Sequence, residues 1–219
     1  MDIDAPSPGL NQNLQVLFAL IIIIFLSPIL LIISLLVSMS SPGPILFRQK
    51  RIGLNGSVFT IYKFRTMKQN NIGSDITASN DQRITKLGNY LRILKLDELP
   101  QLWNIVNKTM SFVGPRPEVK KYVNYDLTIW KKILSVRPGL TNPVMFELIN
   151  EQSFLKKIKN KEIFYEKFLL PYKLKIQLEY LNRRTWLSDL KIIFLTIFLI
   201  LFPTLSKKPS IEKIKNNNF

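Results

Sequence analysis

The chain has 219 residues, and its 31 Lys and Arg against 15 Asp and Glu give a net charge of +16. It contains no His and no Cys, which excludes disulfides, thiolate or His-ligated metal sites, and nucleophile constellations built on either residue. Catalysis would have to use carboxylates, cations or hydroxyls, with any metal held by oxygen ligands. The excess of cations favours an anionic partner, either phospholipid head groups, phosphorylated substrates or nucleic acid.

The N-terminal region divides into two parts. Residues 1–13 are polar, include Pro and Gly, and are expected to form a loose lead-in. Residues 14–38 are almost wholly apolar and carry no charge, which predicts a membrane-embedded helix, since about 20 apolar residues suffice. A cleaved signal peptide fits poorly, because Asp2 and Asp4 precede the run where Lys or Arg would be expected. Beside so many cations, this apolar run favours a membrane over nucleic acid.

Ser27 and Pro28 lie near the middle of the apolar run. Pro28 cannot donate a backbone hydrogen bond and its ring clashes with the preceding turn, so we expect a kink. The Ser27 hydroxyl can re-satisfy a freed backbone group, which makes the break tolerable in lipid. Such a break permits a bent span or a re-entrant hairpin that enters and leaves by one face. The cations that follow the run, with none before it, favour a span with a cytoplasmic C-terminal side.

Residues 39–203 predict a small cytoplasmic α/β domain. Extended stretches at 45–51 and 58–67, joined by a glycine-containing turn at 53–56, predict a β-hairpin. Apolar residues then recur at helical spacing over 84–94, with cations between them.

The C-terminal part of the chain is predicted to be helical. Residues 154–190 are rich in Lys and aromatic residues, as interfacial amphipathic helices are. The apolar run at 192–202 is too short to span a bilayer and fits a helix in the core or at the interface. Residues 204–219 are polar and are predicted to form a disordered tail.

Asp97 and Glu98 form an adjacent acidic pair in this basic chain, where a helix is expected to begin. Such a pair is most often a solvated cap, because helix N-termini favour acidic residues. The helix dipole also keeps carboxylates ionised, which suits a nucleophile and a metal ligand. Attack by a carboxylate on a phosphoanhydride requires Mg²⁺ and Arg or Lys to neutralise the phosphate oxygens.

Three cations near this pair are candidates for phosphate binding. Arg116 stands between Pro115 and Pro117, which restrict the backbone and can pre-position the guanidinium for phosphate. A rigid surface turn with a solvated Arg is an equally good account. Lys63 and Arg65 share one face of the second predicted strand, which is more often simply the wet side of a hairpin.

Taken in order, these segments resemble the bacterial sugar transferase family, in its minimal, single-domain, monotopic form, over about residues 14–202. The matching segments are 41–53 (SPGPILFRQKRIG), 59–67 (FTIYKFRTM), 81–88 (DQRITKLG), 96–104 (LDELPQLWN), 110–118 (MSFVGPRPE), 137–141 (RPGLT) and 186–191 (WLSDLK). Several motifs matching in the same order make coincidence an unconvincing explanation.

The resemblance implies transfer of a phospho-sugar from a UDP-sugar to polyprenyl (undecaprenyl) phosphate, with release of UMP. This would be the first membrane step of a glycan assembly, on the cytoplasmic face of a bacterial inner membrane. It implies that Asp97 is the nucleophile, that Glu98 together with Asp97 binds Mg²⁺, and that the helix broken at Ser27 and Pro28 is re-entrant. The substrate-binding residues that it implies are Arg116, Pro115, Lys63, Arg65 and Asp189.

Two other classes of function remain open. A catalytically silent membrane scaffold of a glycan-assembly complex would keep the fold and the anchor but need neither Asp97 nor Mg²⁺. A membrane-tethered nucleic-acid binder is less favoured, because no surface that combines aromatic and basic residues is evident, so no nucleic acid is expected. Which UDP-sugar is used, which glycan is built and whether the chain forms a homodimer are not predicted.

Overall fold

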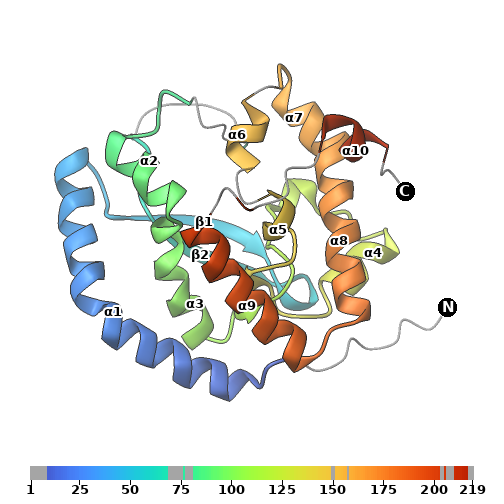
Figure 1. Cartoon of the computed structure of the whole chain (residues 1–219), viewed down its shortest axis with the longest axis horizontal. Coiled ribbons are helices and arrows are strands. Elements are labelled where there is room, and N and C mark those ends of the chain that lie inside the picture. Colours follow the sequence, from blue (N-terminus) through green and yellow to red (C-terminus); the bar gives the residue numbers. More distant parts are fainter. Residues whose placement is uncertain are drawn as a thin grey trace.

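In the computed structural model the chain is a mixed helical and sheet fold with one long apolar helix at its edge (Figure 1). The structure describes residues 9–68, 76, 81–148, 151–156, 158–202, 205 and 210–216. The elements are α1 (Gln12–Ser40), β1 (Leu46–Ile52), η1 (Leu54–Gly56), β2 (Val58–Phe64), α2 (Lys86–Ile93), η2 (Leu96–Gln101), α3 (Leu102–Val106), β3 (Ser111–Val113), η3 (Lys120–Tyr122), α4 (Thr128–Ile133), β4 (Gly139–Thr141), α5 (Met145–Leu148), α6 (Glu151–Leu155), α7 (Lys161–Phe164), the π-helix η4 (Tyr165–Leu169), α8 (Leu170–Asn182), α9 (Trp186–Leu201) and α10 (Ile211–Lys215).

Helix α1 extends two residues beyond the predicted apolar run at each end. It begins at Gln12 because the Asn11 side chain caps it, accepting hydrogen bonds from the amides of Asn13 and Leu14. The helix bends partway along (Figure 1), as expected from the proline inside it. Ser27 Oγ donates to the Ile24 carbonyl at 2.7 Å. That carbonyl would accept from the amide of residue 28 in an unbroken helix, so the predicted role of Ser27 is confirmed.

The apolar side chains of α1 are largely exposed. Ile24 is 72% and Phe25 82% exposed, although Ala19 and Val37 are fully buried against the rest of the fold. Among the described residues, α1 is the helix that is long and apolar enough to cross a membrane. Soluble proteins rarely leave so continuous an apolar surface in water, so α1 has the properties of a helix that contacts lipid.

Strands β1 and β2 form the predicted antiparallel hairpin, with Leu46 opposite Phe64 and Ile52 opposite Val58. Its inner face packs against α3, and Asn104 of α3 fastens the two together. The Asn104 side chain donates to the Thr60 carbonyl at 2.7 Å and accepts from the Tyr62 amide at 3.3 Å. Because Asn104 is only 2% exposed, these two hydrogen bonds fix β2 against α3.

Strands β3 and β4 form a short parallel pair that the sequence did not predict, since three residues are too few to show alternation. Two glycines allow the close approach of the backbones. A Cβ on Gly139 would lie 2.1 Å from the Gly114 amide nitrogen. The Gly139 amide also donates to the Pro115 carbonyl at 2.9 Å. The strand pair thus holds the start of the loop that carries Arg116.

Gly139→Ala should lower the free energy of unfolding by about 2 kcal/mol, because the new methyl group must push two backbones apart. Chemical denaturation of the purified protein in detergent measures the loss. Ser135→Ala, at an exposed position shortly before β4, should change stability by less than about 0.5 kcal/mol. Equal stability of Gly139→Ala and the wild type would contradict the close approach.

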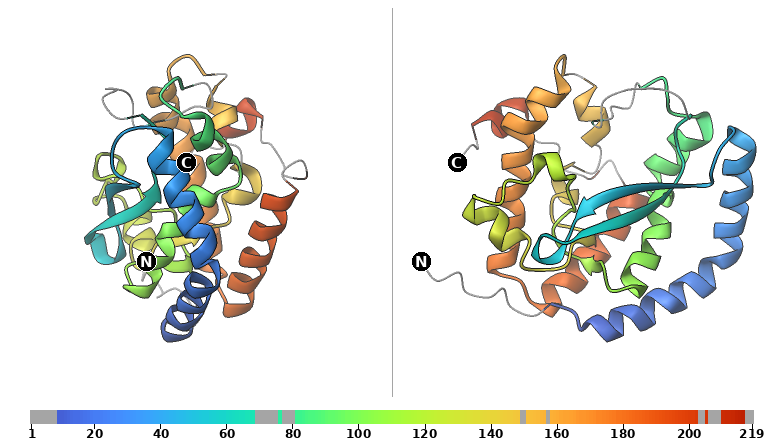
Figure 2. Two further views of the ribbon diagram at one scale, coloured as in Figure 1. Left: turned by 90° about the vertical axis from the view of Figure 1, so that its left-hand side faces the viewer. Right: turned by 180° about the vertical axis from the view of Figure 1, so that it is seen from behind.

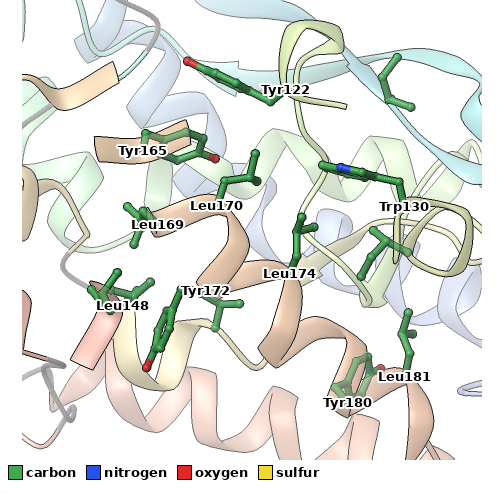
Figure 3. Packing of buried hydrophobic residues seen from close by; sticks show 14 of the residues in the cluster. Tyr122, Trp130, Leu148, Tyr165, Leu169, Leu170, Tyr172, Leu174, Tyr180 and Leu181 are labelled. Carbon is green, nitrogen blue, oxygen red and sulfur yellow. The ribbon is translucent and has the colours of Figure 1, made fainter. Parts of the chain in front are cut away.

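The main core lies around η4 and α8, on the side of the hairpin away from the bend of α1 (Figures 1 and 2). Figure 3 shows its aromatic and aliphatic side chains closely packed, among them Tyr165, Tyr172 and Trp130. Helix α8 is therefore a central core helix, and the prediction that residues 154–190 lie at the membrane interface is wrong for it. The pattern of Lys and aromatic residues was misleading because some of these side chains contact each other inside the protein. Lys173, for example, is only 2% exposed and contacts Tyr165.

The apolar run at 192–202 was expected to form a helix either in the core or at the interface. Helix α9 combines the two, because one set of its side chains is buried and another is exposed. Ile192 and Leu199 are buried, whereas Phe194 is 72% and Leu201 68% exposed. Helix α10 corrects the prediction of a disordered tail for residues 210–216 only, where it buries Ile214 completely in the main core, and much of the rest of 204–219 lies outside the described residues. Its two apolar residues, Ile211 and Ile214, both pack against that core, and the polar composition around them concealed the helix.

Candidate active site

Glu98 is the centre of the charged cluster. It lies on η2, which packs against β2, and its Oε1 is 2.6 Å from Nζ of Lys63. The same oxygen is 3.6 Å from Nη2 of Arg116. The structure therefore brings together one carboxylate and two cations from three separate segments. This arrangement confirms no role, but it places three of the predicted site residues in one cluster.

In this cluster, burial and the neighbouring charges shift the pKa values of Glu98 and Lys63 in opposite directions. Burial of Glu98 disfavours its charged form, but the positive charges of Lys63, Arg116 and Lys95 outweigh it and lower the pKa of Glu98 far below its ordinary value. Burial lowers the pKa of Lys63, although Glu98 acts in the opposite direction. Glu98 is thus firmly ionised, and it holds the two cations in place.

Asp97 differs from Glu98 in its contacts and in the direction of its pKa shift. It is 7% exposed and its Oδ1 is buried without a hydrogen-bond partner in the described part of the chain. Burial, together with the negative charge of Glu98, raises the pKa of Asp97 above its ordinary value. Asp97 therefore lacks the lowered pKa that a helix N-terminus would be expected to give it. It lies on a tight 3₁₀ turn inside the protein, so burial exceeds any dipole effect.

Arg116 is held by its backbone and leaves its guanidinium accessible. Its amide donates to Oε1 of Gln177 on α8 at 2.7 Å, and the preceding Pro115 carbonyl is bonded to β4. The side chain is 31% exposed, so its remaining nitrogens can reach a ligand. The carbonyl of Pro115 fixes the start of this loop.

Arg92 and Lys95 belong to this cluster and were not singled out from the sequence. Arg92 lies in the last turn of α2, and its Nε and Nη1 are buried with no hydrogen-bond partner among the described residues. Its positive charge and that of Lys95 both act to lower the pKa of Asp97. Lys95 adopts a left-handed conformation, with φ of 57°, which is unfavourable for a residue other than Gly. The sequence signal that could have indicated Arg92 and Lys95 was their position within five residues of the acidic pair.

Two predicted substrate residues lie elsewhere. Arg65 Nη2 donates to the carbonyls of Val37 and Ser41, at 3.2 and 2.5 Å, and so ties β2 to the end of α1. Asp189 is 1% exposed and pairs with Arg184 at 3.0 Å, and it accepts hydrogen bonds from Tyr180 and the Leu10 amide. Both residues join elements of the fold, and the contacts described for them include none with Asp97 or Glu98.

Comparison with known proteins identifies the family. The sequence model of the family described as bacterial sugar transferase matches residues 8–203. The chain belongs to the bacterial sugar transferase family. The bacterial sugar transferase motifs at 59–67, 96–104 and 110–118 carry Lys63, Glu98 and Arg116 of this cluster.

Curated relatives agree with this assignment. The chain is 37% identical over 208 residues to the UDP-glucose:undecaprenyl-phosphate glucose-1-phosphate transferase of Escherichia coli (strain K12), covering 89% of this chain and 42% of that protein. It is 33% identical to the exopolysaccharide production protein ExoY of Sinorhizobium fredii, covering 88% of this chain and 86% of that protein. The chain thus spans less than half of the Escherichia coli relative's length.

Two carboxylates of this bacterial sugar transferase site, those of Asp97 and Glu98, could serve as ligands of Mg²⁺. No group of three or more acidic side chains gathers in the described part of the chain, so a metal here would need ligands from elsewhere. Mg²⁺ is commonly bound through one or two carboxylates plus substrate phosphates and water. The unpartnered Oδ1 of Asp97 and the neighbouring Glu98 could supply those carboxylates.

Proposed function

We propose that the chain is a phosphoglycosyl transferase, which moves a phospho-sugar from a UDP-sugar to polyprenyl phosphate and releases UMP. The observation that carries the proposal is the pairing of unlike carboxylates. Asp97 is buried with an unpartnered oxygen, beside Glu98, which two cations hold ionised. The names of two relatives support the substrate class, since both transfer a sugar phosphate from a UDP-sugar to undecaprenyl phosphate.

The reaction would proceed in two displacements at one phosphorus. A carboxylate oxygen of Asp97 attacks the β-phosphorus of the UDP-sugar, the bond to the bridging oxygen breaks, and that oxygen leaves with UMP. An acyl phosphate joining Asp97 to the sugar phosphate remains. A phosphate oxygen of the polyprenyl phosphate then attacks the same phosphorus, and Asp97 leaves as a carboxylate. The product is a polyprenyl diphosphate sugar.

Electrostatics favour this use of Asp97. An anionic nucleophile approaches an anionic phosphate, so nearby cations must neutralise the phosphate oxygens. Arg116 and Arg92 are suited to this, because each has guanidinium nitrogens that Glu98 does not bind. Mg²⁺ bound by Asp97 and Glu98 would supply further neutralisation of the phosphates. A desolvated carboxylate with a raised pKa is also a stronger nucleophile than a solvated one.

The rate of UMP release should fall with decreasing pH at values above the ordinary pKa of an aspartate, about 3.9. Asp97 must be ionised to attack, and its pKa is raised. The positive charge of Lys95 acts against that increase, so Lys95→Met should move the acid limb of the pH profile to higher pH. Profiles of kcat/KM measure the shift. An unchanged acid limb in Lys95→Met would contradict the assignment of that limb to Asp97.

The contacts of α1 support a re-entrant membrane helix. At its start, Oε1 of Gln15 accepts from the Phe112 amide at 2.7 Å, and Gln12 bonds Met110 and Ser111. At its end, the Val37 carbonyl accepts from Arg65. Both ends of α1 therefore contact the same folded domain. A straight span would separate its ends by about 30 Å of hydrocarbon, so a bend with both ends on the cytoplasmic side fits better.

Site-specific labelling tests this topology. The chain has no Cys, so Asp4→Cys and Lys68→Cys each introduce a unique thiol. Both thiols should react with an impermeant reagent only from the cytoplasmic side of inner-membrane vesicles. Reaction of the Asp4→Cys thiol from the outside alone would mean that α1 spans the membrane.

The reaction itself is tested with a panel of UDP-sugars, polyprenyl phosphate and Mg²⁺. The protein should release UMP from at least one donor and form the matching lipid-linked sugar diphosphate. Release of UDP would mean an ordinary glycosyl transfer. No product from any donor would favour the silent scaffold.

A further inference from the structure

A second charged pair adjoins the site and has no part in the proposed displacement steps. Glu151 of α6 and Lys173 of α8 are 2.6 Å apart. Lys173 is only 2% exposed, whereas the Glu151 side chain is 24% exposed. The ammonium is thus enclosed, while part of the carboxylate remains at the surface. One oxygen of Glu151, Oε1, accepts from Lys173, which leaves Oε2 for another donor.

Lys173 is held rigidly from behind. Its Nζ lies 4.6 Å from the centre of the Tyr165 ring and 3.5 Å from the Tyr165 hydroxyl. That hydroxyl donates to Oε1 of Glu118 at 2.8 Å. Tyr165 begins the π-helix η4, a local irregularity that often marks a functional region. Glu151 is therefore positioned by a group that cannot move far.

The pair lies next to Arg116. Lys173 and Gln177 are one helical turn apart on the same face of α8, and the amide of Arg116 donates to Gln177 at 2.7 Å. Burial raises the pKa of Glu151, but the charges of Lys173, Arg116 and Lys95 outweigh it and lower the pKa. Arg116 and Lys95 also act on Glu98. Glu151 and Glu98 are therefore both close to the cation that we assign to the phosphates.

We propose that Glu151 binds the sugar of the donor by accepting hydrogen bonds from its hydroxyl groups, with Lys173 as the positioning residue. The sugar is bonded to the β-phosphate, so it must lie within a few ångströms of the groups that bind that phosphate. Sugar hydroxyls are donors, and an ionised carboxylate is the strongest acceptor that a side chain offers. This inference rests on the proposed function, and it names the group that discriminates between sugars.

A purely structural ion pair is the alternative. Burying an ammonium is costly even when it is paired, so such pairs are weak contributors to stability. A structural pair would also affect every donor equally. The two accounts therefore differ in what a substitution does to sugar binding compared with nucleotide binding.

The test compares the affinities of UDP and a UDP-sugar in the Asp97→Asn background, which prevents turnover. Adding Glu151→Gln should weaken binding of the UDP-sugar on the order of 10-fold to 100-fold, because a charged acceptor is lost. Binding of UDP, which has no sugar, should change less than about 2-fold. Equal weakening of both ligands, or of neither, would overturn the proposal.

Glu147→Gln is the matched control, because Glu147 also pairs with a lysine, Lys213, at 3.0 Å. It should leave the ratio of the two affinities unchanged. In the otherwise wild-type protein, Glu151→Gln should reduce the preference between UDP-glucose and UDP-galactose measured by kcat/KM. Lys173→Met should reduce the same preference by releasing Glu151. A wild type that releases no UMP would refute the proposed function, whereas an active wild type with unchanged preference in both variants refutes only this inference.

Discussion

Asp97→Asn should reduce UMP release by at least about 10³-fold, because the variant has no carboxylate to form the acyl phosphate. The amide is nearly isosteric, so the surrounding cations should stay in place. The measurement is the initial rate of UMP release with a donor that the wild type accepts. A residual rate within about 10-fold of the wild type would mean that Asp97 is not the nucleophile.

The same variant should be more stable than the wild type. A carboxyl group whose pKa is raised by folding destabilises the folded state at pH values above that pKa. The reason is that the group loses its proton more readily in the unfolded chain. Above the folded-state pKa of Asp97 the penalty is fully present, and Asp97→Asn removes it. The expected gain is about 1 kcal/mol in the free energy of unfolding. Loss of activity together with a gain in stability would distinguish a lost nucleophile from a misfolded protein.

Glu98→Gln should have the opposite effect on stability. Glu98 holds Lys63 at 2.6 Å and Arg116 at 3.6 Å, and an amide leaves a mostly buried ammonium without its counter-charge. The expected loss is about 3 kcal/mol in the free energy of unfolding. Because the pKa of Glu98 is lowered, its contribution is present above the ordinary glutamate pKa and disappears as pH falls. UMP release should fall by roughly 10²-fold or more.

A double-mutant cycle with Lys63→Met separates the pair from the rest of the site. The double variant should be less destabilised than the sum of the single variants by about 1–3 kcal/mol. Denaturation of all four proteins under one set of conditions measures this coupling. Strict additivity would show that the Lys63 and Glu98 contact contributes no coupling energy, and the electrostatic account of the site would be wrong.

The parts of the fold that local patterns encode were predictable. The apolar run, the role of Ser27 and the hairpin each follow from a few neighbouring residues, and the structure contains all three. The parallel β3 and β4 pair was missed because its strands are too short for a pattern. Helix α8 was assigned to the interface because nothing in the sequence shows that Lys173 and Tyr165 contact each other inside the protein.

The site divides in the same way. Asp97, Glu98 and Arg116 were found from composition and from the resemblance, and they do lie together in the fold. Arg65 was predicted to share a strand face with Lys63, yet its guanidinium donates to a carbonyl at the end of α1. A shift of two residues along the chain is enough to bring a side chain to a different neighbouring element. Arg92 and Glu151 depend on tertiary contacts across the chain, so no local pattern indicates them.

The central claim is that a sugar phosphate becomes covalently bonded to Asp97, and intact-protein mass spectrometry tests it most directly. The chain is incubated with an accepted UDP-sugar and Mg²⁺, without polyprenyl phosphate, and then measured and digested. We expect a mass increase of one sugar phosphate less one water, located on the peptide that contains Asp97, and its absence in Asp97→Asn. An active enzyme that never carries this adduct, or carries it on another residue, would contradict the mechanism.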